Sequence, residues 1–491
     1  MEGVTRHLER SKLWSIFTKH AASILIVAFL LHLLHTRYNT QLRRFPGPFL
    51  ASFTSLWQVW VASSGKAEEY YMEVHRKYGP VARIGPNEIS FAAPAAGRSI
   101  FKTGQGFHKT EFYTVFLPNN IKDIFTEIGE DVHATKKRYT VPPYSLSSVQ
   151  QHTAQIDALM VKFLQKLDDF AYQGVACDLG KWLHYLAFDT LGEFAFANHF
   201  GFVDAGTDMN NTIATISDST YESGIIAQMP FVERWTRSIP IWNYLPSGKN
   251  KLFLLFNKST EVLQRFQGKE TGEREKCLLR SLLEAHQANP DKFNLNDVLA
   301  VSMGAIGAGS DSTASTMNSF CWHLVAELLQ APLSDIVQYH EALELPYFQA
   351  CLKEVMRLQP AVGMNITRQV PAGGTEIDGV YVQEGTQVAL NGWVLHRDKE
   401  TFGSDADVFN LERWLKASEQ ELKMMERSLF QFGGGSHVCI GRHLALFEIN
   451  KTLPQVFRQY NIRVVDPTHP PAHRTGFFYI QDGLRVYLEK R

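Results

Sequence analysis

Cysteine is scarce in this chain of 491 residues, which contains only five, and no two of them form a Cys-x-x-Cys pair. An odd number without paired spacing argues against both a disulfide framework and a four-cysteine zinc site. The body of the protein is therefore expected to face a reducing compartment, where one thiol can serve a function. The five are Cys177, Cys277, Cys321, Cys351 and Cys439.

An excess of charge is also absent, because 49 Lys and Arg residues balance 50 Asp and Glu residues and leave a formal net charge of −1. Nucleic-acid binders usually carry a basic excess or a basic cluster, so no nucleic-acid partner is expected. Hydrophobic residues make up 45% of the chain and charged residues 20%, which excludes a disordered or fibrous protein.

Long apolar runs are missing except near the N-terminus, where Ala21–Leu34 covers fourteen residues. A membrane span needs about 20 residues. Extension of the run back to Leu13 gives 22 residues, which as a helix would be ~33 Å long, but this longer segment includes Lys19 and His20. We expect residues 1–36 to form a membrane-anchor helix, with a helix lying on the membrane surface or a cleaved signal peptide as weaker alternatives.

Two prolines that bracket a glycine follow this run at Pro46-Gly47-Pro48. Such a sequence cannot continue a helix, so a boundary is expected here. It is either a plain linker or a stiff hinge over residues 37–48 that sets the pose of the body against the membrane. The remaining residues, 49–491, are expected to form one domain.

The body mixes short strands with long helical patterns. Val81–Ile84 and Glu88–Phe91 are predicted strands, and Asp378-Gly379 and Asp482-Gly483 are predicted hairpin turns between apolar runs. Asn294–Gln330 holds 37 residues without proline and is predicted to be helical. The fold class is therefore mainly α with small β-sheets (α+β).

The strongest chemical signal is Phe432–Gly441, which contains three consecutive glycines and Cys439. Glycines allow sharp bends and a close approach to a flat ligand. A helical pattern follows directly, so Cys439 would lie at a helix N-terminus, where the dipole favours the thiolate. Such a thiolate is a good haem-iron ligand. A phosphate-binding loop or a merely structural cysteine are the alternatives, but the Lys-Ser/Thr ending of a phosphate loop is missing.

Three glycines fall within six positions of the long predicted helix, at Gly304, Gly307 and Gly309. Each glycine destabilises a helix by ~1 kcal/mol relative to alanine, so ordinary side-chain packing does not explain why three are present. They would let something large press against the helix and could bend it. Asp311 follows at once and is either a solvated side chain or part of a proton-delivery pair with Ser312.

Glu354 and Arg357 stand three residues apart on a helical segment, a pair worth only ~0.2–0.5 kcal/mol if exposed. Together with the cysteine loop and the Ala-Gly-x-Asp helix, however, Glu-x-x-Arg resembles a cytochrome P-450, a haem-thiolate monooxygenase. The resemblance covers nearly the whole chain. Phe188–Glu193 and Phe200–Phe202 are similar to fungal secondary-metabolism members, notably the pisatin-demethylase-like group.

The resemblance implies a single P-450 domain that holds haem b between two long helices, with Cys439 as the axial ligand of the iron. Asp311, Ser312 and Thr313 would be catalytic on the opposite side and would help to deliver protons. A buried structural charge cluster would unite Glu354, Arg357 and Arg413. The implied cofactor-binding residues are His133, Lys137, Arg138, Arg368, Phe432, Gly435, His437 and Gly441.

Several positions depart from the family's usual pattern. Ser312 replaces a common Thr, and His437 and Lys137 stand where Arg is frequent. Ala331–Glu344 is noticeably shorter than the helix and loop that family members carry there. The fold either tolerates this deletion or the sequence is the product of a mis-spliced gene model.

The resemblance implies insertion of one oxygen atom from O2 into a hydrophobic small molecule, with hydroxylation favoured and a fungal secondary-metabolite pathway as the setting. The chain has no flavin or nicotinamide domain, so NADPH would act through a membrane-bound cytochrome reductase. The expected location is the endoplasmic reticulum membrane, with the catalytic domain in the cytosol. Lys136, Lys137, Arg138, Arg442 and Lys451 could form a basic docking surface.

Two other functions stay open. A haem-thiolate isomerase or dehydratase would share the fold and need no reductase, although an Asp311-Ser312 pair argues against it. An inactive product of a mis-spliced gene would bind no haem. The identity of the substrate depends on the shape of a pocket, which one sequence does not give.

Overall fold

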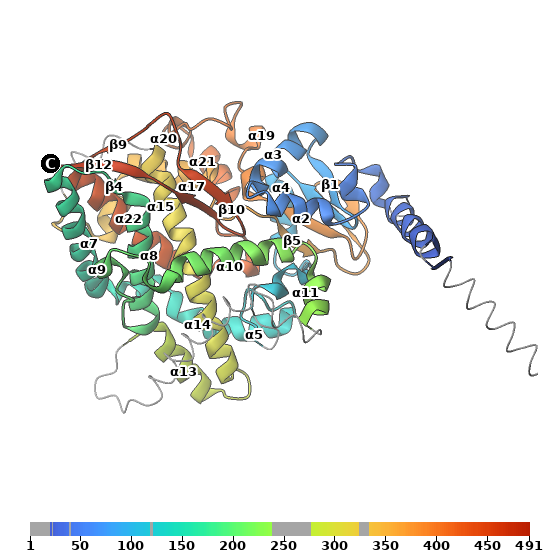
Figure 1. Cartoon of the computed structure of the whole chain (residues 1–491), viewed down its shortest axis with the longest axis horizontal. Coiled ribbons are helices and arrows are strands. Elements are labelled where there is room, and N and C mark those ends of the chain that lie inside the picture. The colour runs from blue at the N-terminus through green and yellow to red at the C-terminus, as the bar shows by residue number, and fades with distance from the viewer. Residues whose placement is uncertain (1–19, 22, 39–40, 118–120, 238–275, 324–332) are drawn as a thin grey trace, which may run out of the picture.

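The computed structural model describes residues 20–21, 23–38, 41–117, 121–237, 276–323 and 333–491. Helices dominate this part of the chain, and the sheets are small (Figure 1). Its longer helices include α2 (Leu56–Ser63), α3 (Ala67–Tyr78), α4 (Pro94–Phe101), α5 (Glu130–Thr140), α7 (Thr153–Gln173), α8 (Leu179–Phe196), α10 (Thr212–Ile226), α11 (Pro230–Arg237), α13 (Leu278–Ala288), α14 (Leu295–Gly309), α15 (Asp311–His323), α17 (Pro346–Leu358), α21 (Glu419–Arg427) and α22 (Arg442–Gln459).

A five-stranded mixed sheet has the order β1-β2-β8-β5-β3, and a three-stranded antiparallel sheet has the order β4-β12-β9. Both predicted strands near residues 81–91 are present as β1 and β2. The large sheet contains β1 (Val81–Gly85), β2 (Glu88–Phe91), β8 (Gln387–Leu390), β5 (Ile366–Gln369) and β3 (His108–Lys109), and the smaller one contains β4 (Cys177–Asp178), β12 (Arg485–Lys490) and β9 (Tyr460–Val464).

Two further strand pairs test the predicted hairpins. Asp378 and Gly379 both have positive φ, at 49° and 73°, and join β6 (Thr375–Ile377) to β7 (Val380–Val382) as predicted. The prediction for Asp482-Gly483 is wrong. The strand before this turn, β11 (Tyr479–Asp482), pairs with β10 (Ala472–Thr475), whereas β12 pairs with β9 and β4.

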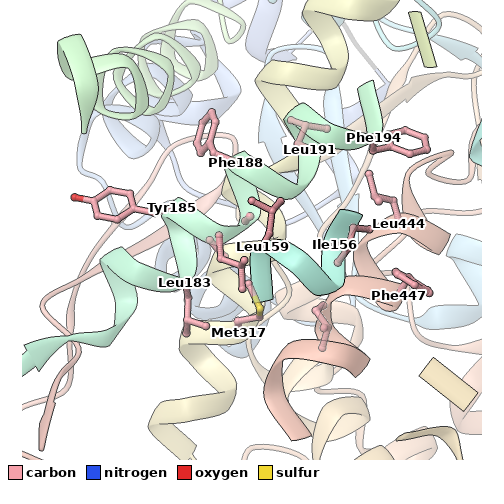
Figure 2. Close-up of a cluster of buried hydrophobic side chains, with 14 of the residues drawn as sticks. Ile156, Leu159, Leu183, Tyr185, Phe188, Leu191, Phe194, Met317, Leu444 and Phe447 are labelled. Atoms are coloured by element: carbon pink, nitrogen blue, oxygen red, sulfur yellow. The ribbon is translucent and has the colours of Figure 1, made fainter. Parts of the chain in front are cut away.

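The main core lies where α7, α8, α15 and α22 meet. Figure 2 shows side chains from these four helices converging, and the cluster is almost fully buried. Leu183, Leu159, Met317 and Phe447 contribute one side chain from each helix, each 2% exposed or less. This packing fixes α15 and α22 relative to each other, and both helices border the site described below.

The long helix predicted from Asn294 is interrupted. Asn294 caps α14 through a capping box with Asp297, and α14 ends at Gly309. Ser310 breaks the helix and α15 begins at Asp311. Glycines preceding the break lower the cost of the bend. The end of the predicted helix lies outside the described part of the chain, which omits residues 324–332.

The predicted hinge itself packs against the body. The N–H of Arg83 donates to the carbonyl of Pro46 at 2.7 Å, and a Cβ on Gly47 would lie 2.0 Å from the carbonyl oxygen of Arg83. The buried guanidinium of Arg83 also donates to the carbonyls of Thr36 and Arg37, at 3.0 and 3.2 Å, where the N-terminal helix ends. Arg83 therefore joins that helix to the sheet.

Residues 23–38 are helical and project from the body near β1 (Figure 1). Within the described residues, no helix combines the length and the apolar character that crossing a membrane requires. The predicted anchor lies partly outside the described part of the chain, because residues 1–19 and 22 do not belong to it.

The short segment after residue 332 packs along α22. The N–H of Val337 donates to Oε1 of Gln455 at 2.7 Å, and Nζ of Lys451 donates to the carbonyl of Val337 at 3.0 Å. The ring of Tyr339, the first residue of α16 (Tyr339–Leu343), stacks 5.3 Å from the ring of Phe447. These contacts cover part of α22 at the place where the sequence is shorter than expected.

Candidate active site

A cavity lies between the α14–α15 region and the loop that precedes α22. The glycine-rich loop contributes one side of it, with Phe432, Cys439 and Gly441 among its lining residues. Gly307, Ala308 and residues of the first turn of α15 contribute another. The cavity thus brings together two motifs that are more than 120 residues apart in the sequence.

Backbone geometry sets the position of Cys439. Its N–H donates to the carbonyl of Phe432 at 2.8 Å, and its sulfur accepts the N–H groups of Gly441 and Arg442. Burial raises the pKa of the thiol above its usual value, while these two N–H groups lower it. The other four cysteines are buried, whereas Cys439 has exposed surface and lines the cavity.

Gly435 has a different role from the one expected. Its φ is +57°, and a Cβ there would lie 1.8 Å from the carbonyl oxygen of Phe101. The residue therefore packs against the end of α4 and does not line the cavity, although Phe432 and Gly441 do. The glycine is required by this close approach of two backbones.

Donor groups gather at the edge of the cavity. His133, Lys137, Arg368 and His437, which the resemblance implies as cofactor-binding residues, all line it. The rings of His133 and His437 lie 4.4 Å apart, and Lys137 donates to the carbonyl of Ser436. Arg138 does not join them, because it lies on the exposed side of α5.

Burial lowers the pKa of both histidines. Burial and the charge of Lys109 lower the pKa of His133 to about 3. Burial likewise lowers the pKa of His437, although Nε2 of this ring lies 3.2 Å from Oε2 of Glu130. Nδ1 of His437 is buried and has no hydrogen-bond partner among the described residues.

Lys109 also lines the cavity and was not identified from the sequence. Its Nζ donates to the carbonyls of Ile124, Phe125 and Glu127 at 2.6, 3.0 and 3.1 Å. Burial, followed by the charge of Arg368, lowers its pKa to about 7. A lysine within the aromatic stretch Phe107–Phe116 is the signal that could have indicated a buried amine.

Hydroxyl groups of α15 face the cavity from the side opposite the cysteine loop. Ser312, Thr313 and Thr316 line it, and each side chain donates to the carbonyl four residues earlier, at 2.8, 2.9 and 3.0 Å. A Cβ on Gly307 would have no neighbour within 4 Å, so the helix is open to the cavity there. At Gly304, by contrast, a Cβ would lie 2.4 Å from Oδ2 of Asp123, so protein rather than ligand accounts for that glycine.

Asp311, the first residue of α15, is buried and does not line the cavity. Its Oδ1 lies 2.8 Å from Nε2 of His184 on α8, and its Oδ2 accepts the hydroxyl of Ser217 on α10 at 3.0 Å. The expectation that Asp311 lines the cavity is therefore corrected. The two partners hold its carboxylate away from the cavity, and the sequence did not indicate either of them.

The charge cluster is compact; the side chains of Glu354 and Arg357 are 0% exposed and that of Arg413 is 6% exposed. Glu354 accepts two hydrogen bonds from Arg357 at 2.8 Å, one from Arg413 at 3.1 Å and one from the indole of Trp414 at 2.8 Å. Burial raises the pKa of Glu354, but the hydrogen bonds and charge of Arg357, together with the hydrogen bonds from Asn410 and Trp414, outweigh burial, so the pKa lies below its usual value. The cluster ties α17 to α20 (Glu412–Leu415).

These residues suit a haem. The sulfur of Cys439 accepts backbone donors, as an iron-binding thiolate does. The cations Lys137 and Arg368 and the unpartnered Nδ1 of His437 lie at the edge, where two carboxylates need donors. The open surface at Gly307 admits a flat group.

Comparison with known proteins identifies the family of the chain. Residues 46–486 match the family described as Cytochrome P450. The chain is 33% identical to the cytochrome P450 monooxygenase mpaDE of Penicillium roqueforti over 95% of its own length, but it spans only 58% of that protein. It is 30% identical to the monooxygenase cicH of Emericella nidulans (93% of this chain, 95% of cicH) and 29% identical to a pisatin demethylase of Fusarium vanettenii (90% and 89%). This chain belongs to the cytochrome P450 family.

Proposed function

We propose that the protein is a haem-thiolate monooxygenase that inserts one oxygen atom from O2 into a hydrophobic small molecule. The observation that carries the proposal is the position of Cys439. Its sulfur accepts two backbone N–H groups, and the residue lines a cavity that α15 also lines. Four other cysteines are buried elsewhere, so Cys439 is the thiol available to an iron.

In this proposal Cys439 holds the iron of haem b, and His133, Lys137, Arg368 and His437 hold its carboxylates. Haem supplies the reductive activation of dioxygen, which the thiolate promotes. The chain positions the cofactor and excludes water from it. Arg368 is itself held by Tyr113, to whose hydroxyl it donates at 2.6 Å, so this cation is fixed in place before any ligand binds.

We assign proton delivery to the first turn of α15. Ser312 and Thr313 present hydroxyls to the cavity, and Asp311 precedes them. Because the Asp311 carboxylate is bound to His184 and Ser217, it would receive protons from that side and pass them on by rotation of its side chain.

Electrons would come from NADPH through a membrane-bound cytochrome reductase. Two residues of the expected basic docking surface do not belong to it. Lys136 has an 11% exposed side chain and lies 3.0 Å from Oδ1 of Asp297, while Lys451 is 1% exposed and lies 2.7 Å from Asp157. Arg138 and Arg442 are exposed and are the residues that we assign to docking.

We also propose attachment to the endoplasmic reticulum membrane through the N-terminal segment, with the catalytic domain in the cytosol. Apolar side chains of the helix at residues 23–38 are exposed, and Leu25, Phe29 and Leu31 are each 60% exposed or more. Exposed Phe49 and Trp60 extend this apolar surface onto the body. In water such a surface is unfavourable, and lipid would cover it.

The similarity to fungal monooxygenases supports a role in secondary metabolism, and hydroxylation is the reaction we favour. The test reconstitutes the full chain with haem, a membrane-bound reductase and NADPH, and supplies phenanthrene under isotope-labelled dioxygen. Labelled oxygen in the product supports the proposal. A normal haem-thiolate spectrum without any labelled product from a panel of such probes would favour the isomerase or dehydratase alternative instead.

A further inference from the structure

One face of α10 presents hydroxyl groups to the cavity, in addition to those of α15. Ile216, Ser219, Thr220 and Ser223 line the cavity from this helix. Their spacing of three and four residues places them on a single helical stripe. Three of the four carry a hydroxyl, whereas a helix that merely covered an apolar cavity would present aliphatic side chains there.

The three hydroxyls differ in their hydrogen bonding. Thr220 donates to the carbonyl of Ile216 at 2.6 Å. Ser219 and Ser223 are 6% and 7% exposed, and within the described residues neither side chain has a hydrogen-bond partner. Because both residues line the cavity, a ligand oxygen can reach these hydroxyls and exchange the hydrogen bond that no described protein group supplies.

Aromatic rings form the neighbouring wall. Phe116, Phe125 and Phe477 line the cavity and pack edge to face, with ring centroids 5.1 to 5.4 Å apart. Gly476, next to Phe477, lies so close to α10 that a Cβ there would be 2.6 Å from Cα of Tyr221. The aromatic wall and the hydroxyl stripe are therefore adjacent parts of one pocket, which suits a flat apolar ring system with a polar edge.

Charged groups lie elsewhere in the cavity. Lys109, Lys137 and Arg368 belong to the edge that we assign to the haem carboxylates, and Oδ1 of Asp123 accepts the N–H groups of Phe125 and Thr126. The α10 stripe itself contains no ionisable side chain. A substrate bound there would be neutral, because an ion would lose its hydration without gaining an opposite charge.

We propose that Ser219 and Ser223 form the specificity site for a neutral, planar, aromatic substrate that carries a hydroxyl or carbonyl oxygen. This inference rests on the proposed function, since it concerns the same cavity. The oxygen exchanges hydrogen bonds with the two serines, and the ring system packs against Phe116, Phe125 and Phe477. The substrate is thereby oriented by its oxygenated edge, away from the cation-lined side of the cavity.

The test measures dissociation constants of the full-length holoenzyme for phenanthrene and for its monohydroxy isomers, from the shift of the haem Soret band and from probe fluorescence. We expect at least one isomer to bind the wild type about 2- to 10-fold more tightly than phenanthrene, the value of one neutral hydrogen bond. Ser219→Ala/Ser223→Ala should bring the two constants to parity. Thr220→Val is the matched control and should keep the preference, because its hydroxyl is already bonded within α10.

The inference would be overturned if the wild type showed no preference, or if the preference survived in the double variant. It would also be overturned if Thr220→Val abolished the preference equally. The two serines would then be small residues that leave space for a large substrate. Should the double variant lose its haem, the two single variants are titrated in its place. Failure of the proposed function is distinguishable, because a wild type without thiolate ligation would lack the red-shifted band with carbon monoxide, while the fluorescence titration would still report the preference.

Discussion

The carboxylate of Asp311 lies 2.8 Å from Nε2 of His184, and this contact connects α15 to α8 behind the cavity wall. The imidazole has a 14% exposed side chain, whereas the carboxylate is 1% exposed. His184 is therefore the partner through which Asp311 can exchange protons with solvent. The arrangement places a titratable group, rather than a permanent cation, beside the acid.

Replacement of His184 by Phe should leave haem binding intact and slow turnover about 100-fold, with a larger solvent isotope effect, because Asp311 loses its source of protons. The measurement is reductase-supported NADPH oxidation in light and heavy water. Ser217→Ala removes the other contact to Asp311 without removing a titratable group and serves as the control. Equal rates for His184→Phe and the wild type would rule out this proton path.

Glu354→Gln should lower the free energy of unfolding by about 3–5 kcal/mol, because it leaves Arg357 and Arg413 buried beside a neutral amide. Urea denaturation measures this. As a control, Glu426→Gln breaks the partly exposed pair with Lys353 and should cost less than about 1 kcal/mol. Similar losses for both variants would contradict the account of the cluster.

The same variant should change the acid dependence of stability. The pKa of folded Glu354 is depressed, so its contribution is fully present above the ordinary glutamate pKa of 4.5 and is lost as the pH falls through the lower folded value. The unfolding free energy of Glu354→Gln should therefore decline less steeply on acidification. A decline as steep as that of the wild type would show that another carboxylate controls it.

Glu448 on α22 should produce the opposite dependence. The carboxyl is 3% exposed, its Oε1 has no hydrogen-bond partner among the described residues, and burial raises its pKa to about 8. The folded protein keeps this carboxyl protonated, whereas the unfolded chain loses the proton above its ordinary pKa of 4.5. The contribution of Glu448 to stability is therefore fully present below pH 4.5 and is lost as the pH rises towards 8. Glu448→Gln should raise the free energy of unfolding at pH 8 by about 2 kcal/mol and flatten this slope. Unchanged stability at that pH would mean that the carboxyl is solvated.

Arg138→Glu/Arg442→Glu should slow reduction by the reductase about tenfold at low ionic strength, with a smaller effect at high salt, because both side chains are exposed cations. Stopped-flow reduction under carbon monoxide measures the rate. Arg485→Glu reverses an exposed charge on β12 and should have no effect. A reduction rate that responds equally to all three positions would exclude a specific docking surface.

Local signals in the sequence predicted those parts of the molecule that local chemistry determines. The helix predicted from Asn294 begins after this residue, Asp378 and Gly379 form the predicted turn, and Cys439 precedes a helix. In each case the residues that decide the conformation lie within a few positions of one another. Such patterns are readable because hydrogen bonding and backbone preference act over the same short range.

The errors concern partners that lie far away in the sequence. Asp482-Gly483 has the composition of a hairpin turn, but β12 instead pairs with β9 and β4. Asp311 turns away from the cavity because His184 and Ser217, 127 and 94 residues distant, bind its carboxylate. Turn composition and residue spacing carry no information about which distant element supplies the partner.

Burial of charge was equally inaccessible to the sequence. Lys136 and Lys137 are adjacent, yet only Lys137 faces the cavity, whereas Lys136 pairs with Asp297. Lys109 is enclosed by three carbonyls that a separate loop supplies. A lysine is an exposed cation or a buried donor according to the elements that pack around it, and only the tertiary structure specifies those.

The central claim is that the thiolate of Cys439 binds the iron of a haem. The most direct measurement is the carbon-monoxide difference spectrum of the reduced full-length protein, recorded for the wild type and for Cys439→Ser. We predict the red-shifted Soret band of thiolate ligation in the wild type and its absence in the variant. A band typical of imidazole or neutral thiol in the wild type, or the same red-shifted band in both proteins, would contradict the assignment.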